Sequence, residues 1–313
     1  MFIDKLIESI RDKNNPTVVG LDPKLEYVPE FIREKAFKEY GVTLKGAAQA
    51  ILQLNKQLID AFHDLVPAVK PQLAYYEMYG VEGITVFDET CKYAKSKGML
   101  VIADGKRNDI GTTAEAYSKA FLGETALTAE LKEKAFDVDA LTVSPYLGVD
   151  GIKPFIDDCA SHKKGIFVLV KTSNKSSGQL QDLVTQDCRS IYEVMASYVN
   201  EWGKSVTGKY GYSSVGAVVG ATYPNQAKLL RSIMKHAFIL VPGYGAQGGT
   251  ANDCVYNFNK DGLGAIVNAS RSVMCAYRSE NWKHQYSEDR FADAARAEVI
   301  RMKEDLNKAL SER

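Results

Sequence analysis

Several features that often assign a function from sequence alone are scarce or missing here. The 313 residues include 39 basic and 39 acidic side chains, so the formal net charge is zero. This balance gives no electrostatic reason to expect nucleic acid or an anionic membrane as a partner. No apolar run approaches the roughly 20 residues that span a bilayer. Acidic residues stand among the basic ones in residues 1–16, and a signal peptide's apolar core is missing, so we expect a cytoplasmic protein.

Cysteine and histidine offer little chemistry. The five cysteines are scattered, odd in number and without a Cys-x-x-Cys pair, which indicates neither a disulfide framework nor a zinc site. The four histidines are predicted on helix faces or in loops. We therefore expect any acid–base chemistry to depend on lysine and aspartate.

Short apolar segments of strand length alternate with amphipathic helical patterns along the whole chain. This alternation predicts an α/β fold, a (β/α)8 TIM barrel, with a doubly wound open sheet as the second choice. We expect residues 1–313 to form a single domain with insertions at 24–45 and 204–214. The predicted strands are 17–21, 68–72, 99–103, 140–144, 165–170, 215–220, 237–241 and 263–268. The predicted helices are 2–10, 47–65, 81–94, 114–121 with an extension to 135, 191–202, 229–234 and 291–306.

Charged residues follow directly after the third predicted strand, namely Asp104, Lys106 and Asp109. Residues two apart in a strand share a face, so the side chains of Asp104 and Lys106 should point the same way. A carboxylate and an ammonium at the carboxyl end of a buried strand suggest an active site, although an ordinary surface ion pair gives the same pattern. Residues 110–113 break the strand, and a threonine there can cap the helix that begins near Ala114.

Polar residues recur at the carboxyl ends of the predicted strands. In a barrel these ends converge on one mouth, where active sites are found. One such residue would carry little weight, but this many together favour a functional site. The residues are Asp22, Lys70, Asp104, Lys106, Ser173, Thr222, Gln247 and Arg271.

The ends of the seventh and eighth strands indicate a phosphate site. Four glycines in residues 243–249 allow close backbone approach, and Gln247 offers an amide. Arg271 follows the next strand and can bind phosphate through its guanidinium. Barrels often bind phosphate between these two loops, although the glycines alone would also suit a plain mobile loop.

The Asp104-x-Lys106-x-x-Asp109 pattern resembles the Asp-x-Lys-x-x-Asp signature of the orotidine 5′-phosphate decarboxylase family. Asp22 after the first strand and Lys70 in the second resemble other motifs of that family. So do residues 242–249 (Pro-Gly-Tyr-Gly-Ala-Gln-Gly-Gly) and 270–272 (Ser-Arg-Ser). The chain length and the wording of residues 103–113 resemble the longer, bacterial-type (type 2) branch.

This resemblance implies a homodimer that decarboxylates orotidine 5′-monophosphate to UMP, the last step of pyrimidine synthesis, without metal or cofactor. It implies that Lys106 donates a proton to C6 of the pyrimidine and that Asp104 sits beside the substrate carboxylate. Lys70 and Asp109 would complete an array of alternating charge, with Asp109 and Thr113 reaching in from the partner subunit.

The resemblance also implies the remaining substrate contacts. Asp22 and Lys70 would contact the ribose, and Ser173 the edge of the pyrimidine ring. Because the loop that carries Ser173 is variable, that role could shift by one residue to Thr172 or Asn174. The phosphate would be bound by the loop that begins at Pro242, by Gln247 and by Arg271.

Two alternatives remain at this point. One is a decarboxylase or aldolase of the same barrel group that acts on a phosphosugar with Mg²⁺. Such enzymes carry an acidic metal ligand where this chain has Lys70, and a lysine cannot bind Mg²⁺ as a carboxylate does. The other is a catalytically silent barrel that serves as a binding protein. The retention of every charged residue at the strand ends argues against it.

Overall fold

The computed structural model describes residues 1–245 and 248–313. Within these residues, eight strands form a closed barrel with the neighbour order β1-β10-β9-β8-β7-β6-β3-β2. The neighbouring strands whose register is defined pair in parallel. The predicted TIM barrel is therefore confirmed. The strands are β1 (Thr17–Leu21), β2 (Ala68–Pro71), β3 (Leu100–Arg107), β6 (Ala140–Val143), β7 (Gly165–Lys171), β8 (Ser213–Val219), β9 (Ala237–Val241) and β10 (Ala265–Ala269).

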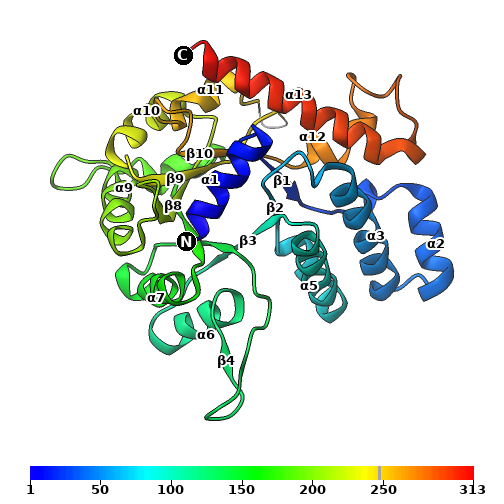
Figure 1. Cartoon of the computed structure of the whole chain (residues 1–313), viewed down its shortest axis with the longest axis horizontal. Coiled ribbons are helices and arrows are strands. Elements are labelled where there is room, and N and C mark those ends of the chain that lie inside the picture. The colour runs from blue at the N-terminus through cyan, green and yellow to red at the C-terminus, as the bar shows by residue number, and fades with distance from the viewer. Residues whose placement is uncertain (246–247) are drawn as a thin grey trace. The chain divides into compact units, whose positions relative to one another are not determined.

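Helices follow the strands along the chain, as Figure 1 shows. The longer ones are α1 (Phe2–Lys13), α2 (Glu30–Tyr40), α3 (Leu44–Phe62), α5 (Gly80–Ser96), α6 (Gly111–Phe121), α7 (Lys153–His162), α9 (Ile191–Trp202), α10 (Pro224–Ile233) and α13 (Phe291–Ser311). Four single-turn helices are α4 (Ala74–Glu77), α8 (Gly178–Gln181), α11 (Ala251–Cys254) and α12 (Arg271–Met274).

Six of the eight barrel strands are buried along their whole length because helices cover a parallel sheet. Every residue of β1, β2, β6, β8, β9 and β10 is buried. This explains why the strands appear in the sequence as continuous apolar runs rather than as alternating patterns. The predicted bounds of β1 and β9 coincide with the observed ones.

The described chain divides into two compact units. Unit 1 consists of Met1–Ser9, Gly105–Asn268 and Leu306–Arg313. In its core the ring of Phe2 meets that of Phe167 edge-on, with centroids 6.2 Å apart. Helix α9 of this unit begins with a capping box, in which the side chains of Ser190 and Glu193 satisfy backbone donors reciprocally.

Unit 2 consists of Ile10–Asp104 and Ala269–Asp305. The predicted insertion at 24–45 forms α2, which packs against α3. Helix α3 also carries a buried polar group: the amide of Asn55 donates to the hydroxyl of Tyr76 at 2.9 Å and to that of Thr90 at 3.1 Å. Buried polar atoms that are paired in this way stabilise one arrangement of the core.

Two local predictions are wrong. The helix extended to residue 135 ends at Phe121, and a small antiparallel hairpin follows, made of β4 (Thr125–Ala126) and β5 (Lys132–Glu133). Figure 1 shows the segment with β4 extending beyond α6. All four strand residues are exposed, so no apolar face holds this segment in a helix. Helix α6 also lacks a threonine cap, because Ile110 occupies the cap position and the two threonines lie inside the first turn.

Among the described residues, no helix combines the length and the apolar character needed to cross a bilayer.

Candidate active site

Three of the predicted site residues lie together in unit 2. Lys70, in β2, is only 4% exposed, and Asp104, in β3, is 7% exposed. The Nζ atom of Lys70 lies 2.8 Å from Oδ2 of Asp104 and 3.8 Å from Oδ1 of Asp22, which follows β1 directly. The parallel register of β2 with β1 and β3 brings the three strand ends together. We call these residues the Lys70 cluster.

The charges of the Lys70 cluster depend on one another. Burial by itself would lower the pKa of Lys70, but the carboxylates of Asp104 and Asp22 outweigh it and hold that pKa above its ordinary value. An unpaired buried ammonium would lose its proton or destabilise the fold, whereas a paired one keeps its charge. The cluster is therefore a fixed positive charge between two carboxylates.

Lys106 lies two residues beyond Asp104 and has an unusual backbone. Strand β3 continues through the predicted charged motif to Arg107, but Lys106 has a φ of +46°, in the left-handed region. The alternation of faces expected for a regular strand therefore stops at Lys106. Its backbone N–H donates to Oγ1 of Thr142 at 3.0 Å. A non-glycine residue held in this conformation is a feature often found at functional sites.

Arg107 is a residue of the motif that sequence reasoning missed. Its guanidinium donates to the backbone oxygen of Gly105 at 3.1 Å and lies over the rings of Tyr117 and Phe121. Its own backbone oxygen accepts from Ser144 at 3.0 Å. These contacts hold the backbone on both sides of Lys106. The sequence signal, an arginine followed ten residues later by an aromatic residue on a helix, is too common to find it.

Asp109 and Thr113 lie at the start of α6. One carboxylate oxygen of Asp109 accepts from the N–H of Ile110 at 2.7 Å, just before the helix begins. A carboxylate is stabilised near a helix amino terminus by the unpaired N–H groups and the helix dipole. Thr113 lies in the first turn of the helix and is exposed.

Ser173 lies in the loop after β7, pressed against the end of β8. A Cβ atom added to Gly220 would meet backbone and side-chain atoms of Ser173 at 2.8–2.9 Å, so only glycine fits there. The backbone oxygen of Ser173 accepts from Oγ1 of Thr222 at 3.3 Å. The structure thus places two predicted residues, Ser173 and Thr222, next to each other.

The described residues of the loop after β9 include three glycines with a backbone conformation that favours glycine. Gly243, Gly245 and Gly248 all have positive φ, which other residues rarely adopt. The N–H of Gly249 donates to the backbone oxygen of Gly243 at 3.0 Å. Pro242 begins this loop, and its backbone oxygen accepts from the N–H of Ala221.

The last two predicted phosphate contacts are Gln247 and Arg271. Gln247 lies outside the described residues. Arg271 is the first residue of α12, and its side chain is exposed. Three residues later, Sδ of Met274 accepts from the N–H of Asp22 at 3.3 Å. Helix α12 therefore connects to the Lys70 cluster through Met274.

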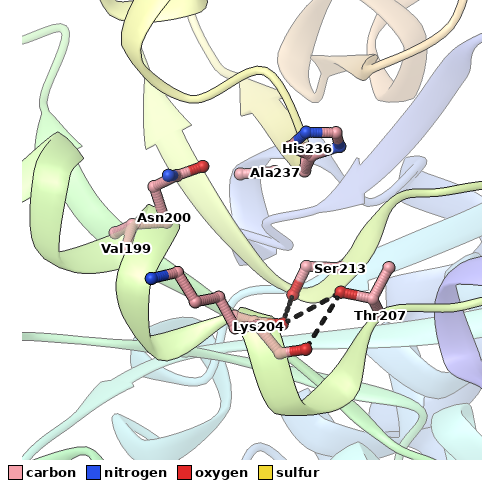
Figure 2. Close-up of a pocket in the computed structure, with 8 residues that line it drawn as sticks. Val199, Asn200, Lys204, Thr207, Ser213, His236 and Ala237 are labelled. Carbon is pink, nitrogen blue, oxygen red and sulfur yellow. Dashed lines mark hydrogen bonds between the residues drawn. The ribbon is translucent and has the colours of Figure 1, made fainter.

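A separate small pocket lies at the opposite ends of the strands, where β8 and β9 begin. Figure 2 shows its lining, which includes Lys204, Thr207, Ser213 and His236. The hydroxyl of Ser213 donates to the backbone oxygen of Gly203 at 2.9 Å, and that of Thr207 donates to nearby backbone oxygens as well. Its hydroxyl groups are thus already bonded within the protein. Barrel active sites lie at the carboxyl ends of strands, so this pocket is not the candidate site.

Comparison with known proteins shows which family this arrangement belongs to. Residues 18–284 match the family described as "Orotidine 5'-phosphate decarboxylase / HUMPS family". The chain belongs to this family. The family predicted from the motifs is therefore confirmed, and so is the prediction that the chain is a decarboxylase.

Curated members of the orotidine 5′-phosphate decarboxylase family match the chain end to end. The proteins of that name from Caldicellulosiruptor saccharolyticus and Rhodopirellula baltica are each 44% identical to it. They are covered over 99% and 98% of their own lengths, against 99% and 97% of this chain. The solved structure of OMP decarboxylase from Leishmania donovani has 28% identity and a TM-score of 0.73, with 99% of this chain and 98% of that one covered. These full-length matches support the longer, type 2 branch.

Proposed function

We propose that this chain converts orotidine 5′-monophosphate into UMP and CO₂, the last step of de novo pyrimidine synthesis, with Lys106 as the proton donor. The observation that carries the proposal is the Lys70 cluster, in which a buried ammonium is held between Asp104 and Asp22. Asp104 and Lys106 are separated by one residue of the same strand. The cluster thus adjoins the proposed proton donor in sequence.

The chemistry requires a fixed positive charge. Loss of CO₂ from C6 leaves a carbanion in the plane of the ring with no neighbouring electron sink. An ammonium group at C6 stabilises this developing negative charge and then donates a proton to the carbon. Lys106 performs both tasks in the proposed mechanism. The electron pair of the broken C–C bond remains on C6 and takes the proton of Lys106, and the carboxylate leaves as CO₂.

Lys70 and Asp104 prepare the site for this step. Asp104 stands beside the substrate carboxylate, where like charges repel before the reaction and the repulsion falls as neutral CO₂ forms. The short contact with Lys70 fixes the position of the Asp104 carboxylate. Preorganised charge of this kind needs no rearrangement during the reaction.

The other contacts bind parts of the substrate that do not react. Such remote binding energy supports the reaction at C6 by holding the substrate in place, with the loop that contains residues 243–249 closing over the phosphate. The proposed contacts are Asp22 and Lys70 with the ribose, Ser173 with the pyrimidine, and Pro242, Gln247 and Arg271 with the phosphate.

We further propose that the active protein is a cytoplasmic homodimer in which residues 1–313 form one barrel domain. Asp109 and Thr113 of one subunit complete the site of the other in this proposal. Their position at the start of α6, with Thr113 exposed, is compatible with such sharing. The proposed reaction needs neither metal nor cofactor, and neither nucleic acid nor a membrane is a partner.

The test is the loss of the orotate ultraviolet absorbance when purified protein, treated with EDTA, meets orotidine 5′-monophosphate. We expect rapid loss with UMP and CO₂ as products. Folded protein that leaves the absorbance unchanged would reject the proposed reaction. Turnover that appears only after Mg²⁺ is added back would reject the metal-free mechanism.

A further inference from the structure

The most deeply buried lysine among the described residues, Lys171, lies outside the proposed catalytic machinery. It is the last residue of β7, and its side chain is completely buried. A buried charge is costly unless it is paired. Its Nζ atom lies 2.5 Å from Oδ1 of Asp182, which directly follows α8. The ammonium also lies 4.6 Å from the ring centroid of Tyr223 and 5.5 Å from that of Tyr192, within range of cation–π attraction.

A bulge in β7 determines the direction of this side chain. Leu169 pairs with Val218 and Lys171 with Val219, so β7 has one residue more than β8 over this stretch. Val218 and Val219 are neighbours in β8 and face opposite sides of the sheet. Their partners Leu169 and Lys171 therefore also face opposite sides, although they are two residues apart in β7. Its partners come from α9 and from the segments after α8 and before α10. Lys171 thus points into the helical layer rather than toward the barrel axis.

The pair of Lys171 and Asp182 closes a loop of ten residues, 172–181. A second set of contacts closes the same loop one residue further in: the N–H of Thr172 donates to Oε1 of Gln181 at 3.0 Å, and Nε2 of Gln181 donates to Oγ1 of Thr172 at 2.8 Å. We call residues 171–182 the tied loop.

Tyr223 connects the buried ammonium to the middle of the tied loop. Its hydroxyl donates to the backbone oxygen of Asn174 at 3.2 Å and accepts from the hydroxyl of Ser177 at 3.3 Å. Its ring lies against Lys171 at the same time. Ser173, the residue before Asn174, is held on its other side by Thr222 and by the close approach of Gly220.

We propose that Lys171 is a positioning residue for substrate recognition, which acts through Asp182 and Tyr223 to hold Ser173 against the pyrimidine ring. This inference rests on the proposed function, because it needs Ser173 to contact the substrate. Lys171 itself touches neither the substrate nor the reacting atoms. Loss of its charge removes the outer of the two sets of contacts that close the tied loop, and it lowers the fraction of molecules in which Ser173 is in place.

The experiment is a double-mutant cycle on kcat/KM for orotidine 5′-monophosphate. Lys171→Met keeps the length of the side chain and removes the charge, and we expect kcat/KM to fall about tenfold, mainly through a higher KM. Lys153→Met is the matched control, because Lys153 forms an equally simple pair with Asp157 at 2.6 Å on the exposed surface. We expect the control to match the wild type.

Ser173→Ala distinguishes positioning from a general loss of structure. If Lys171 acts through Ser173, the double variant is about as impaired as the worse single variant. Fold-losses that multiply in the double variant would overturn the inference, and so would an unchanged kcat/KM in Lys171→Met or in Ser173→Ala. In these cases the wild-type turnover still stands, so the proposed reaction survives, and an unchanged Ser173→Ala rejects only the proposed contact of Ser173 with the pyrimidine. Absence of turnover in the folded wild type overturns both.

A second variant serves if Lys171→Met fails to fold. Asp182 is 48% exposed, so Asp182→Asn leaves the packing in place and weakens the same pair. We expect a fall of about threefold in kcat/KM. In the double variant with Ser173→Ala, we expect kcat/KM to be about as low as in the worse of the two single variants. Faster amide hydrogen exchange confined to residues 172–182 is the matching physical signature. Additive losses, or exchange that stays as slow as in the wild type, would overturn the inference.

Discussion

The Nζ atom of Lys70 and the Oδ2 atom of Asp104 lie 2.8 Å apart, and neither side chain is more than 10% exposed. The two residues come from neighbouring parallel strands, β2 and β3, and are separated by 34 positions in sequence. A buried pair of this kind stabilises the fold less than its short distance suggests, because both ions lose their water. Its value in this protein lies in the fixed position it gives to the Asp104 carboxylate.

Removal of the lysine should therefore damage both the fold and the reaction. Lys70→Met leaves Asp104 buried without its cation, and we expect the free energy of unfolding to fall by about 3 kcal/mol. We expect kcat/KM to fall at least about a hundredfold in the folded fraction, because the preorganised charge is lost. Denaturant titration and the absorbance assay measure the two effects.

Lys92→Met is the control for this experiment. Lys92 pairs with Asp88 at 2.7 Å on the exposed face of α5, and exposed pairs contribute little. We expect a change in stability below about 0.5 kcal/mol and normal turnover. Equal effects of the two substitutions would contradict a special role for the buried pair.

The pH dependence of stability follows from the raised pKa of Lys70. Burial works against the charge, yet Asp104 and Asp22 keep the pKa above the ordinary value of 10.5. The stabilisation is therefore complete below that ordinary value and is lost as the pH rises through the higher pKa of the folded protein. The stability difference between wild type and Lys70→Met should stay constant from about pH 7 to about pH 9 and shrink above about pH 10.5. A difference that already shrinks between pH 7 and 9 would show that the sign is wrong.

Lys106 should show opposite effects on activity and on stability. Lys106→Ala removes the proposed proton donor, and we expect decarboxylation to be abolished while the fold is kept. Lys106→Gly should be equally inactive but about 1 kcal/mol more stable than Lys106→Ala, because glycine adopts the observed φ of +46° without strain. Preserved turnover in either variant would contradict the mechanism, and equal stabilities would contradict the strained backbone.

Shared sites can be tested with hybrid dimers. Lys106→Ala and Asp109→Ala subunits are each expected to be inactive alone. After mixing and subunit exchange, a hybrid should contain one site in which both residues are intact, and partial activity should return. If subunits exchange and no activity returns, Asp109 acts within its own chain.

Arg231 should be important for stability and not for the reaction. It is 5% exposed and donates to the backbone oxygens of Asn257, Gly264 and Ala237 at 2.8–3.2 Å. Arg231→Met leaves these oxygens without that donor, and we expect a loss of about 3 kcal/mol. The exposed Arg290→Met serves as the control, with a change of at most about 0.5 kcal/mol. Thermal unfolding checks both, and an unchanged midpoint in Arg231→Met would contradict this role.

Much of the fold could be predicted because local signals and tertiary structure agree. The apolar run of β9 is bounded by polar or glycine-rich segments, and α9 carries a capping box at Ser190 and ends before Gly203. The Lys70 cluster could be predicted because barrel topology brings the strand ends together whatever the loops do.

The parts that could not be predicted depend on contacts between distant residues. The sequence of residues 122–135 contains helix formers, yet residues 125–135 are exposed, and the β4–β5 hairpin forms instead. The left-handed backbone of Lys106 is not visible in a strand-like run of residues. The sequence alone indicates that Lys171 is one more polar residue of a loop. Its burial depends on Asp182, Tyr192 and Tyr223, which are distant in sequence.

The contacts that close the tied loop determine whether its backbone becomes ordered during folding or on substrate binding. A free loop of ten residues would lose its conformational entropy on meeting the ligand, and that loss would weaken binding. Here the two sets of contacts at its ends restrict the loop as the protein folds. The association of a substrate with this side of the barrel should therefore resemble docking to a rigid template. The proposed closure over the phosphate would then take place in another loop, the one that follows β9.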